Sequence, residues 1–246
     1  MTVPIILVLA VMLAWESWRP FFGFFGKDLK AKAVHDGWNL AIGAFNGFLI
    51  ALVFASLWAS AASWSYNNDF GLLRWIELPW VLRLAAVFVL FDAYMYLWHR
   101  MNHEIPFLWR FHIFHHTDEQ MDVTTATRFH TAEIVLSSLL RVPVIALLGV
   151  PIADLVIYEA VMFAVVQFHH ADIRIPDVWE QRLSKVIVTP NLHKVHHSAW
   201  LPETDSNYGS LFSFWDQVFG SKRVRHDVEN IRFGVDPAEP TPPPSV

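Results

Sequence analysis

Cysteine is absent from this sequence of 246 residues, and charged side chains are scarce. A chain without cysteine cannot build a disulfide scaffold, a cysteine nucleophile, an iron–sulfur cluster, or a zinc or haem site that uses a thiolate. Asp, Glu, Lys and Arg make up only 17% of the residues, below the level typical of soluble domains. Acidic residues outnumber basic ones by 23 to 18, so no basic surplus is available to bind nucleic acid.

Apolar residues are abundant instead. They make up 54% of the chain, with 12 Trp and 20 Phe, and the mean hydropathy is +0.33. This composition excludes a disordered chain. The length is typical of one domain, which we expect to cover residues 1–236. The proline-rich residues 237–246 are expected to form a disordered tail.

Long apolar segments predict an all-α integral membrane protein. Residues 40–64 are almost wholly apolar, and about 20 such residues cross a bilayer. Two further spans are predicted, a marginal anchor at 3–15 and a segment at 84–98. The fourth segment, 134–168, contains Pro143 and Pro151. Because proline breaks or kinks helices, we expect two half-spans here that form a hairpin.

The distribution of positive charge predicts the orientation. Four basic residues separate the first two apolar segments, two separate the second from the third, and eight follow the hairpin. The cytoplasmic side carries the excess of Lys and Arg. We therefore expect an external amino terminus and a multi-pass protein whose polar cap, from His99 onward, lies on the cytoplasmic side.

Histidine is the unusual residue of this sequence. Eleven of the thirteen histidines lie between positions 99 and 197. Eight of them form clusters at helical spacing, listed as His99 with His103; His112 with His115 and His116; and His193 with His196 and His197. Residues at i, i+3 and i+4 share one face of a helix, so each triplet is expected to direct its rings to a single site.

This many imidazoles predicts two metal ions rather than one. A single zinc site needs three or four ligands, whereas two ions with four or five ligands each use eight to ten. Imidazole binds iron, copper, nickel and zinc. Two redox-active ions in a membrane protein favour oxygen chemistry with iron, although spacing does not separate iron from zinc, which could replace iron during purification.

Six segments carry a specific resemblance. They are 92–103 (DAYMYLWHRMNH), 108–116 (LWRFHIFHH), 124–133 (TTATRFHTAE), 167–176 (QFHHADIRIP), 189–198 (TPNLHKVHHS) and 205–220 (DSNYGSLFSFWDQVFG). In this order they resemble the fatty acid hydroxylase superfamily, also called the sterol desaturase family, whose members are membrane-bound, histidine-ligated di-iron enzymes of lipid synthesis.

The resemblance implies a set of metal ligands. These are His99, His103, His112, His115, His116, His170, His193, His196 and His197, with His130 as a tenth candidate. Two motifs depart from the family pattern: His130-Thr131-Ala132-Glu133 replaces His-Pro-x-Glu, and His170-Ala171-Asp172 replaces His-Ser-Asn. The first leaves His130 open as a ligand or a supporting residue. The second leaves open whether His169 or His170 faces the metal, and we expect His170.

Asp92 is the candidate for a supporting role in catalysis. It interrupts an apolar segment, where a carboxylate is costly, and it lies seven and eleven residues before His99 and His103 on the same helical face. We expect it to accept a hydrogen bond from a ligand imidazole. The alternative is an ion pair with Arg83. Glu159, which precedes His170 by eleven residues, fits the same reasoning more weakly.

The sequence thus predicts an O₂-dependent oxidoreductase that hydroxylates or desaturates a lipid C–H bond with two iron ions. No Gly-x-Gly-x-x-Gly motif occurs, so electrons are expected from an external donor, such as a reductase with a ferredoxin or a cytochrome b5. Two alternatives remain at this point: a non-enzymatic membrane protein that binds haem or metal, and a membrane zinc hydrolase.

Overall fold

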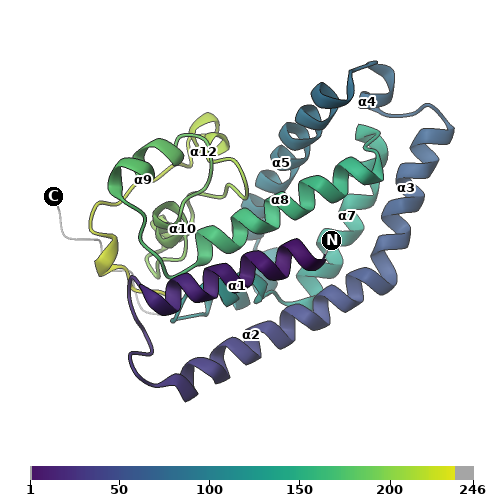
Figure 1. The fold of residues 1–246 in the computed structure, drawn as a ribbon. Coiled ribbons are helices and arrows are strands. Elements are labelled where there is room, and N and C mark those ends of the chain that lie inside the picture. Colours follow the sequence, from purple (N-terminus) through teal and green to yellow (C-terminus); the bar gives the residue numbers. More distant parts are fainter. Residues whose placement is uncertain (1, 236–246) are drawn as a thin grey trace.

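The computed structural model describes residues 2–235, with side chains described from Ile6 onward. Helices dominate this range, and its only β-structure consists of two isolated bridges, Ile187 with Phe212 and Ser198 with Phe233. The prediction of an all-α fold is therefore confirmed (Figure 1). The tail predicted at 237–246 lies outside the described residues.

The longer helices come first in the chain, with three short elements, at 50–54, 72–75 and 123–127, between them. In order, these elements are α1 (Thr2–Trp18), α2 (Leu29–Leu49), the π-helix η1 (Ile50–Phe54), α3 (Ala55–Asn67), α4 (Leu72–Trp75), α5 (Trp80–Glu104), α6 (Pro106–His116), the 3₁₀-helix η2 (Val123–Thr127), α7 (Thr131–Leu148) and α8 (Ile152–His170). Short elements follow: α9 (Asp177–Leu183), α10 (Pro190–His196), α11 (Leu201–Thr204), α12 (Phe214–Val218) and the 3₁₀-helix η3 (Val228–Asn230).

Within residues 2–235, four segments are long and apolar enough to cross a membrane: Leu29–Trp75, α5, α7 and α8. The first corresponds to the span predicted at 40–64, but it is much longer. Figure 1 shows a bend between α2 and α3, where η1 interrupts the α-helical hydrogen bonds. Bends at π-helical turns are common, because the extra residue disrupts the regular ladder. The N-terminal helix α1 is shorter and packs against α8.

The predicted hairpin consists of α7 and α8, and each arm is longer than a half-span. The arms have 18 and 19 residues, close to the length that crosses a bilayer. Pro143 lies inside α7 without ending it; the chain turns instead at Gly149, whose φ of +70° suits glycine. A Cβ on Gly71 would lie 2.5 Å from the Gly149 nitrogen, so these two turns are in close contact.

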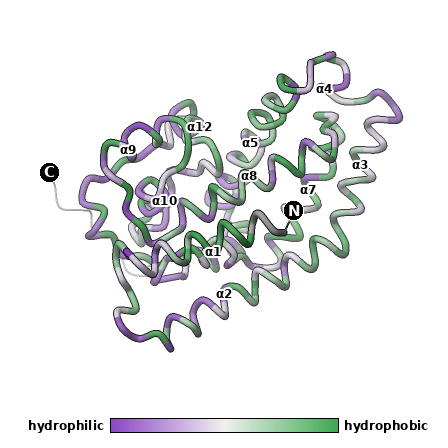
Figure 2. The backbone as a smooth tube through the Cα atoms, in the orientation of Figure 1, coloured by the Kyte–Doolittle hydropathy of each residue, from purple (hydrophilic) through white to green (hydrophobic). Residues whose placement is uncertain are grey.

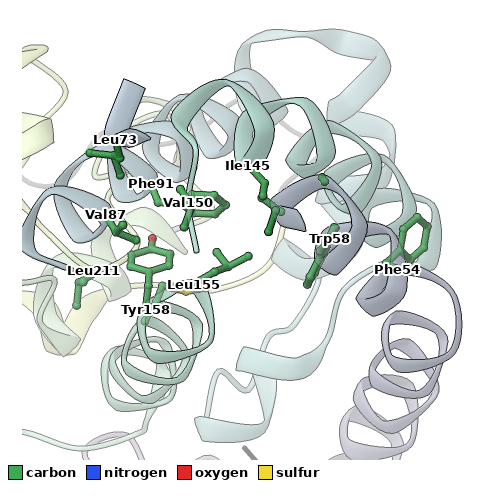
Figure 3. Packing of buried hydrophobic residues seen from close by; sticks show 13 residues of the cluster. Phe54, Trp58, Leu73, Val87, Phe91, Ile145, Val150, Leu155, Tyr158 and Leu211 are labelled. Atoms are coloured by element: carbon green, nitrogen blue, oxygen red, sulfur yellow. The ribbon is translucent and has the colours of Figure 1, made fainter. Parts of the chain in front are cut away.

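The main apolar core lies between α3, α5, α7 and α8. Figure 3 shows Phe91 and Val87 of α5 close to Tyr158 of α8, with Ile145 of α7 near Trp58 of α3. The rings of Phe91 and Tyr158 are 5.3 Å apart. Figure 2 shows the contrast with the C-terminal region around α9–α12, where hydrophilic and hydrophobic positions alternate over short distances. We call residues 171–235 the cap.

Candidate metal centre

The histidines gather where α5, α6, α8 and α10 meet. α5 ends at Glu104 and α6 begins at Pro106, so a single residue, Ile105, separates them. Pro106 occupies the first turn of α6, where its missing N–H is not needed. α10 likewise begins with Pro190. These sharp turns place the histidines of three helices against those at the end of α8.

Nine histidines form two adjoining groups. The five-histidine group contains His99, His103, His112, His116 and His196, and the four-histidine group contains His115, His170, His193 and His197. Within each group, every residue offers a ring nitrogen within 4.8 Å of those of the others. The two groups touch, because the rings of His116 and His197 stack with their centres 4.4 Å apart.

Each triplet contributes to both groups, which corrects the expectation that its three rings face a single site. His112 and His116, one helical turn apart, belong to the five-histidine group, whereas His115 belongs to the other. The second triplet is divided the other way: His193 and His197 belong to the four-histidine group, and His196 belongs to the five-histidine group. The i+3 residue is rotated away from the i, i+4 row, and with helices on two sides this rotation reaches a second site.

Backbone carbonyls determine which ring nitrogen is free. The Nδ1–H groups of His99 and His196 donate to the carbonyls of Tyr208 and Ser206, at 2.8 and 2.7 Å. A carbonyl oxygen can only accept, so Nδ1 carries the proton and Nε2 keeps its lone pair. The same holds for His115 with the Arg128 carbonyl and for His170 with the Val166 carbonyl.

The free nitrogens fit metal binding. Five buried Nε2 atoms have no hydrogen-bond partner, namely those of His103, His112, His116, His196 and His197. The Nε2 atoms of His115 and His170, both with lone pairs, lie 3.2 Å apart, although two lone pairs repel. Ligands about 2.1 Å from one metal ion lie about 3.0–3.4 Å apart, so a shared cation would remove this repulsion.

Burial keeps these imidazoles in the form that binds metal. Burial lowers the pKa of His196 to about 3. It also lowers the pKa of His115, His116, His193 and His197 well below the usual value. All are therefore neutral near pH 7, and a neutral imidazole is the ligand that iron and zinc require.

Two of the candidate histidines lie outside both groups. His130 is exposed and accepts the backbone N–H of Ala132 at the start of α7, so it is a helix cap. His169 is buried, and its ring lies 3.9 Å from that of His193, but His170 is the member of the four-histidine group. The structure thus brings together nine of the ten predicted ligands.

Asp92 does not contact a histidine. Its carboxylate accepts four hydrogen bonds, listed as those from the Tyr158 hydroxyl, the Leu211 and Phe212 backbone N–H groups and the Trp215 indole. The alternative partner, Arg83, pairs with Asp154 at 2.8 Å. Asp92 therefore joins α5 and α8 to the cap, and the expected bond to a ligand imidazole is corrected. Glu159 likewise pairs with Arg141.

Two carboxylates that the sequence reasoning missed hold imidazoles instead. Oε1 of Glu133 accepts the Nδ1–H of His112 at 2.9 Å, with both groups buried. Oδ1 of Asp205 lies 3.3 Å from Nδ1 of His103. Glu133 lies in a recognised motif, three residues after His130, so its position signalled a role. Asp205 is 102 residues from its partner, and nothing local in the sequence connects the two.

A cavity of about 230 Å³ lies beside the histidines. Its wall includes His99, His112, His115, His170 and His193, and apolar side chains of α5, α7 and α8 line the remainder, among them Met95, Ile134, Met162, Phe163 and Val166. The candidate metal centre therefore opens onto a largely apolar chamber.

Comparison with known proteins identifies related sequences. A family model described as fatty acid hydroxylase matches residues 84–221. The chain is 28% identical to ornithine lipid hydroxylase OlsE of Rhizobium tropici, over 89% of this chain and 64% of that protein. It is 31% identical to the alkylglycerol monooxygenase of Caenorhabditis elegans, over 63% and 30% respectively.

A third relative is a cholesterol 25-hydroxylase-like protein of Danio rerio, 29% identical over 67% of this chain and 72% of that protein. The chain thus spans less than two thirds of the first two relatives. The comparison with solved structures found no match.

Proposed function

The chain belongs to the fatty acid hydroxylase family, and from this premise we propose that it is a membrane-bound di-iron oxygenase. It inserts oxygen into, or removes hydrogen from, a C–H bond of a lipid, using O₂ and external electrons. One observation carries the proposal: two adjoining groups of buried neutral imidazoles, five and four in number, border an apolar cavity.

The nine grouped histidines would hold the two ions, one in each group. When bound, such ions supply the redox chemistry that activates O₂. The contribution of the chain is to direct Nε2 lone pairs inward, to exclude water by burying every grouped histidine except His99, which is partly exposed, and to align one carbon of a lipid chain along the cavity. His130 is then a helix cap rather than a ligand.

The names of the relatives favour hydroxylation over desaturation, since all three act as hydroxylases or monooxygenases by name. The donor of electrons is a separate protein of the ferredoxin–reductase or cytochrome b5 type. We assign the active site to the cytoplasmic side, because the basic residues of the cap follow the positive-inside rule. Zinc is expected to replace iron in part during purification.

The test begins with the metal content of the full chain, produced with ample iron and kept reduced. We expect about two metal ions per chain, with iron and zinc counted together. Lipid extracts of cells with and without the gene are then compared for a species that has gained one oxygen atom or lost two hydrogen atoms, whose formation needs O₂ and a reductant.

Three outcomes would contradict the proposal. A content of one metal ion per chain in fully loaded protein would contradict the proposal of two metal ions. A Soret absorption band without non-haem iron would favour a haem protein. Turnover of a lipid ester or amide without O₂ and reductant would favour a zinc hydrolase.

A further inference from the structure

The cavity beside the histidines also contains an ion pair. Arg141 of α7 and Glu159 of α8 line it together with His170, which is at the end of α8. Glu159 and His170 are eleven residues apart on this one helix, which corresponds to about 16 Å along its axis. The cavity therefore runs from the candidate metal centre to a charged pair within the membrane-crossing part of the bundle.

The Arg141 guanidinium is held firmly but incompletely bonded. Its Nη1 donates to Oε1 of Glu159 at 2.6 Å, and Nη2 donates to the Met95 sulfur at 3.2 Å. The guanidinium lies over the Trp58 ring, 5.3 Å from its centre. Nε is buried and has no hydrogen-bond partner. The pair thus retains an unused donor, and it engages only one oxygen of Glu159.

The two ion pairs on α8 differ in what they face. Arg83 and Asp154 join α5 to α8 at 2.8 Å, and neither lines the cavity. Arg141 and Glu159 face the chamber instead. Ionisable residues within membrane helices are costly, and those that face a cavity are commonly part of a substrate pathway.

We propose that Arg141 and Glu159 bind a hydroxyl group of the lipid substrate, an inference that rests on the proposed lipid oxygenase function. A carboxylate or an ammonium group on the lipid would have to compete with one member of the 2.6 Å pair. A hydroxyl accepts from the guanidinium and donates to the carboxylate, so the pair stays intact. The substrate class is then a lipid that carries a hydroxyl group at a distance from the oxidised carbon.

Binding without turnover tests this inference. The full chain is placed in lipid nanodiscs with its metals but without O₂ or reductant, and the affinities for hexadecanol and hexadecyl methyl ether are compared by native mass spectrometry. The ether has a similar chain but no donor. Because hydrogen bonds to charged groups are strong when buried, we expect the alcohol to bind about tenfold more tightly.

Double variants show which residues cause the tighter binding of the alcohol. Replacing both members of the pair, Arg141→Met with Glu159→Met, should abolish the preference for the alcohol over the ether. The matched control, Arg83→Met with Asp154→Asn, removes an ion pair from the same helix outside the cavity and should retain it. Equal binding of alcohol and ether by the wild type, or a preserved preference in the Arg141 and Glu159 variant, would overturn the inference.

A measurement on the wild type does not depend on the folding of these variants. Hexadecanol with a photoreactive diazirine beside its hydroxyl should label peptides around Arg141 and Glu159, and a diazirine near the methyl end should label peptides around His99 and His112. The reverse pattern would refute the assignment. Since no step needs turnover, an absence of oxidised lipid in cells with a retained alcohol preference would count against the oxygenase alone.

Discussion

The two histidine groups differ in what supports them. In the five-histidine group, His99, His103 and His196 all bond to the short cap segment 205–208. In the four-histidine group, His115 and His170 bond to carbonyls at 128 and 166, outside the cap, and Nδ1 of both His193 and His197 has no partner. Segment 205–208 thus orients the rings of three histidines of the five-histidine group. The four-histidine group takes His193 and His197 from the cap, but it has no hydrogen bond from this segment.

This difference means that the two sites can be perturbed separately. The cap segment is itself held in place: the Tyr208 N–H donates to Asp216 at 2.7 Å, and the Asn207 N–H donates to the Ser221 carbonyl. Loosening segment 205–208 should therefore weaken the five-histidine group more than the four-histidine group. The following predictions are ordered by the size of the expected effect.

Removing one ligand from either group should have the largest effect. We expect His196→Ala and His193→Ala each to abolish turnover and to lower the metal content to about one ion per chain, because an open position leaves the ion weakly held. Elemental analysis of the purified chain measures this. His130→Ala is the control, since it removes the exposed N-cap side chain of helix α7 and should lower the free energy of unfolding by about 1 kcal/mol. Loss of a metal ion in His130→Ala would require a different ligand set.

Glu133→Gln should have the next largest effect and should be confined to the five-histidine group. The amide keeps the shape of the side chain but loses the charge that favours the Nδ1–H form of His112. Changes of this kind typically cost roughly 10–100-fold in metal affinity or activity. Competition with a chelator measures the affinity. The control is Glu104→Gln, which changes an exposed carboxylate at the end of α5 that pairs with Arg100. It should leave the metal affinity unchanged, and equal losses in both variants would contradict the assignment.

Asp92→Asn tests the attachment of the cap. The amide can no longer accept hydrogen bonds from all four donors, so we expect the free energy of unfolding to fall by about 1–3 kcal/mol. Metal affinity of the five-histidine group should fall less than in Glu133→Gln, and turnover per folded molecule should stay near the wild-type value. A large loss of turnover without a loss of stability would restore the catalytic role first expected for Asp92.

The pH dependence of the unfolding free energy, measured after a chelator has removed the metal, tests the contribution of a single histidine. The pKa of His196 is lowered from 6.5 to about 3, so the unfolded chain binds more protons than the folded chain between these values. The free energy of unfolding therefore does not change with the titration of this histidine above pH 6.5. Below pH 6.5 it falls by about 1.4 kcal/mol per pH unit for each such histidine. Denaturant titrations at several pH values give the free energy of unfolding as a function of pH. Between about pH 3 and 6.5 its slope should be smaller in His196→Gln than in the wild type by the contribution of one histidine. An identical slope in the two proteins would contradict the lowered pKa.

The sequence was informative where a signal was local. Apolar length predicted the helices, and the histidine spacing along α5, α6 and residues 193–197 identified eight of the nine grouped histidines before any contact was known. Of the two prolines from which the hairpin was predicted, Pro143 lies inside α7 without ending it. Pro151 lies at the turn, directly before α8, and the turn also needs the left-handed Gly149. The span at 40–64 was too short, since charged and polar residues at its start pack against η2 and still continue the helix.

Tertiary structure alone decided how the histidines divide and which carboxylates hold them. His112, His115 and His116 share one face in sequence terms, yet the approach of α8 on one side and α5 on the other sends them to different groups. Asp92 shares a helical face with His99 and His103, but its carboxylate instead accepts three hydrogen bonds from residues 211–215 of the cap and a fourth from Tyr158 of α8. Helical periodicity determines which side chains lie along one face, whereas packing between segments far apart in the chain determines what that face meets.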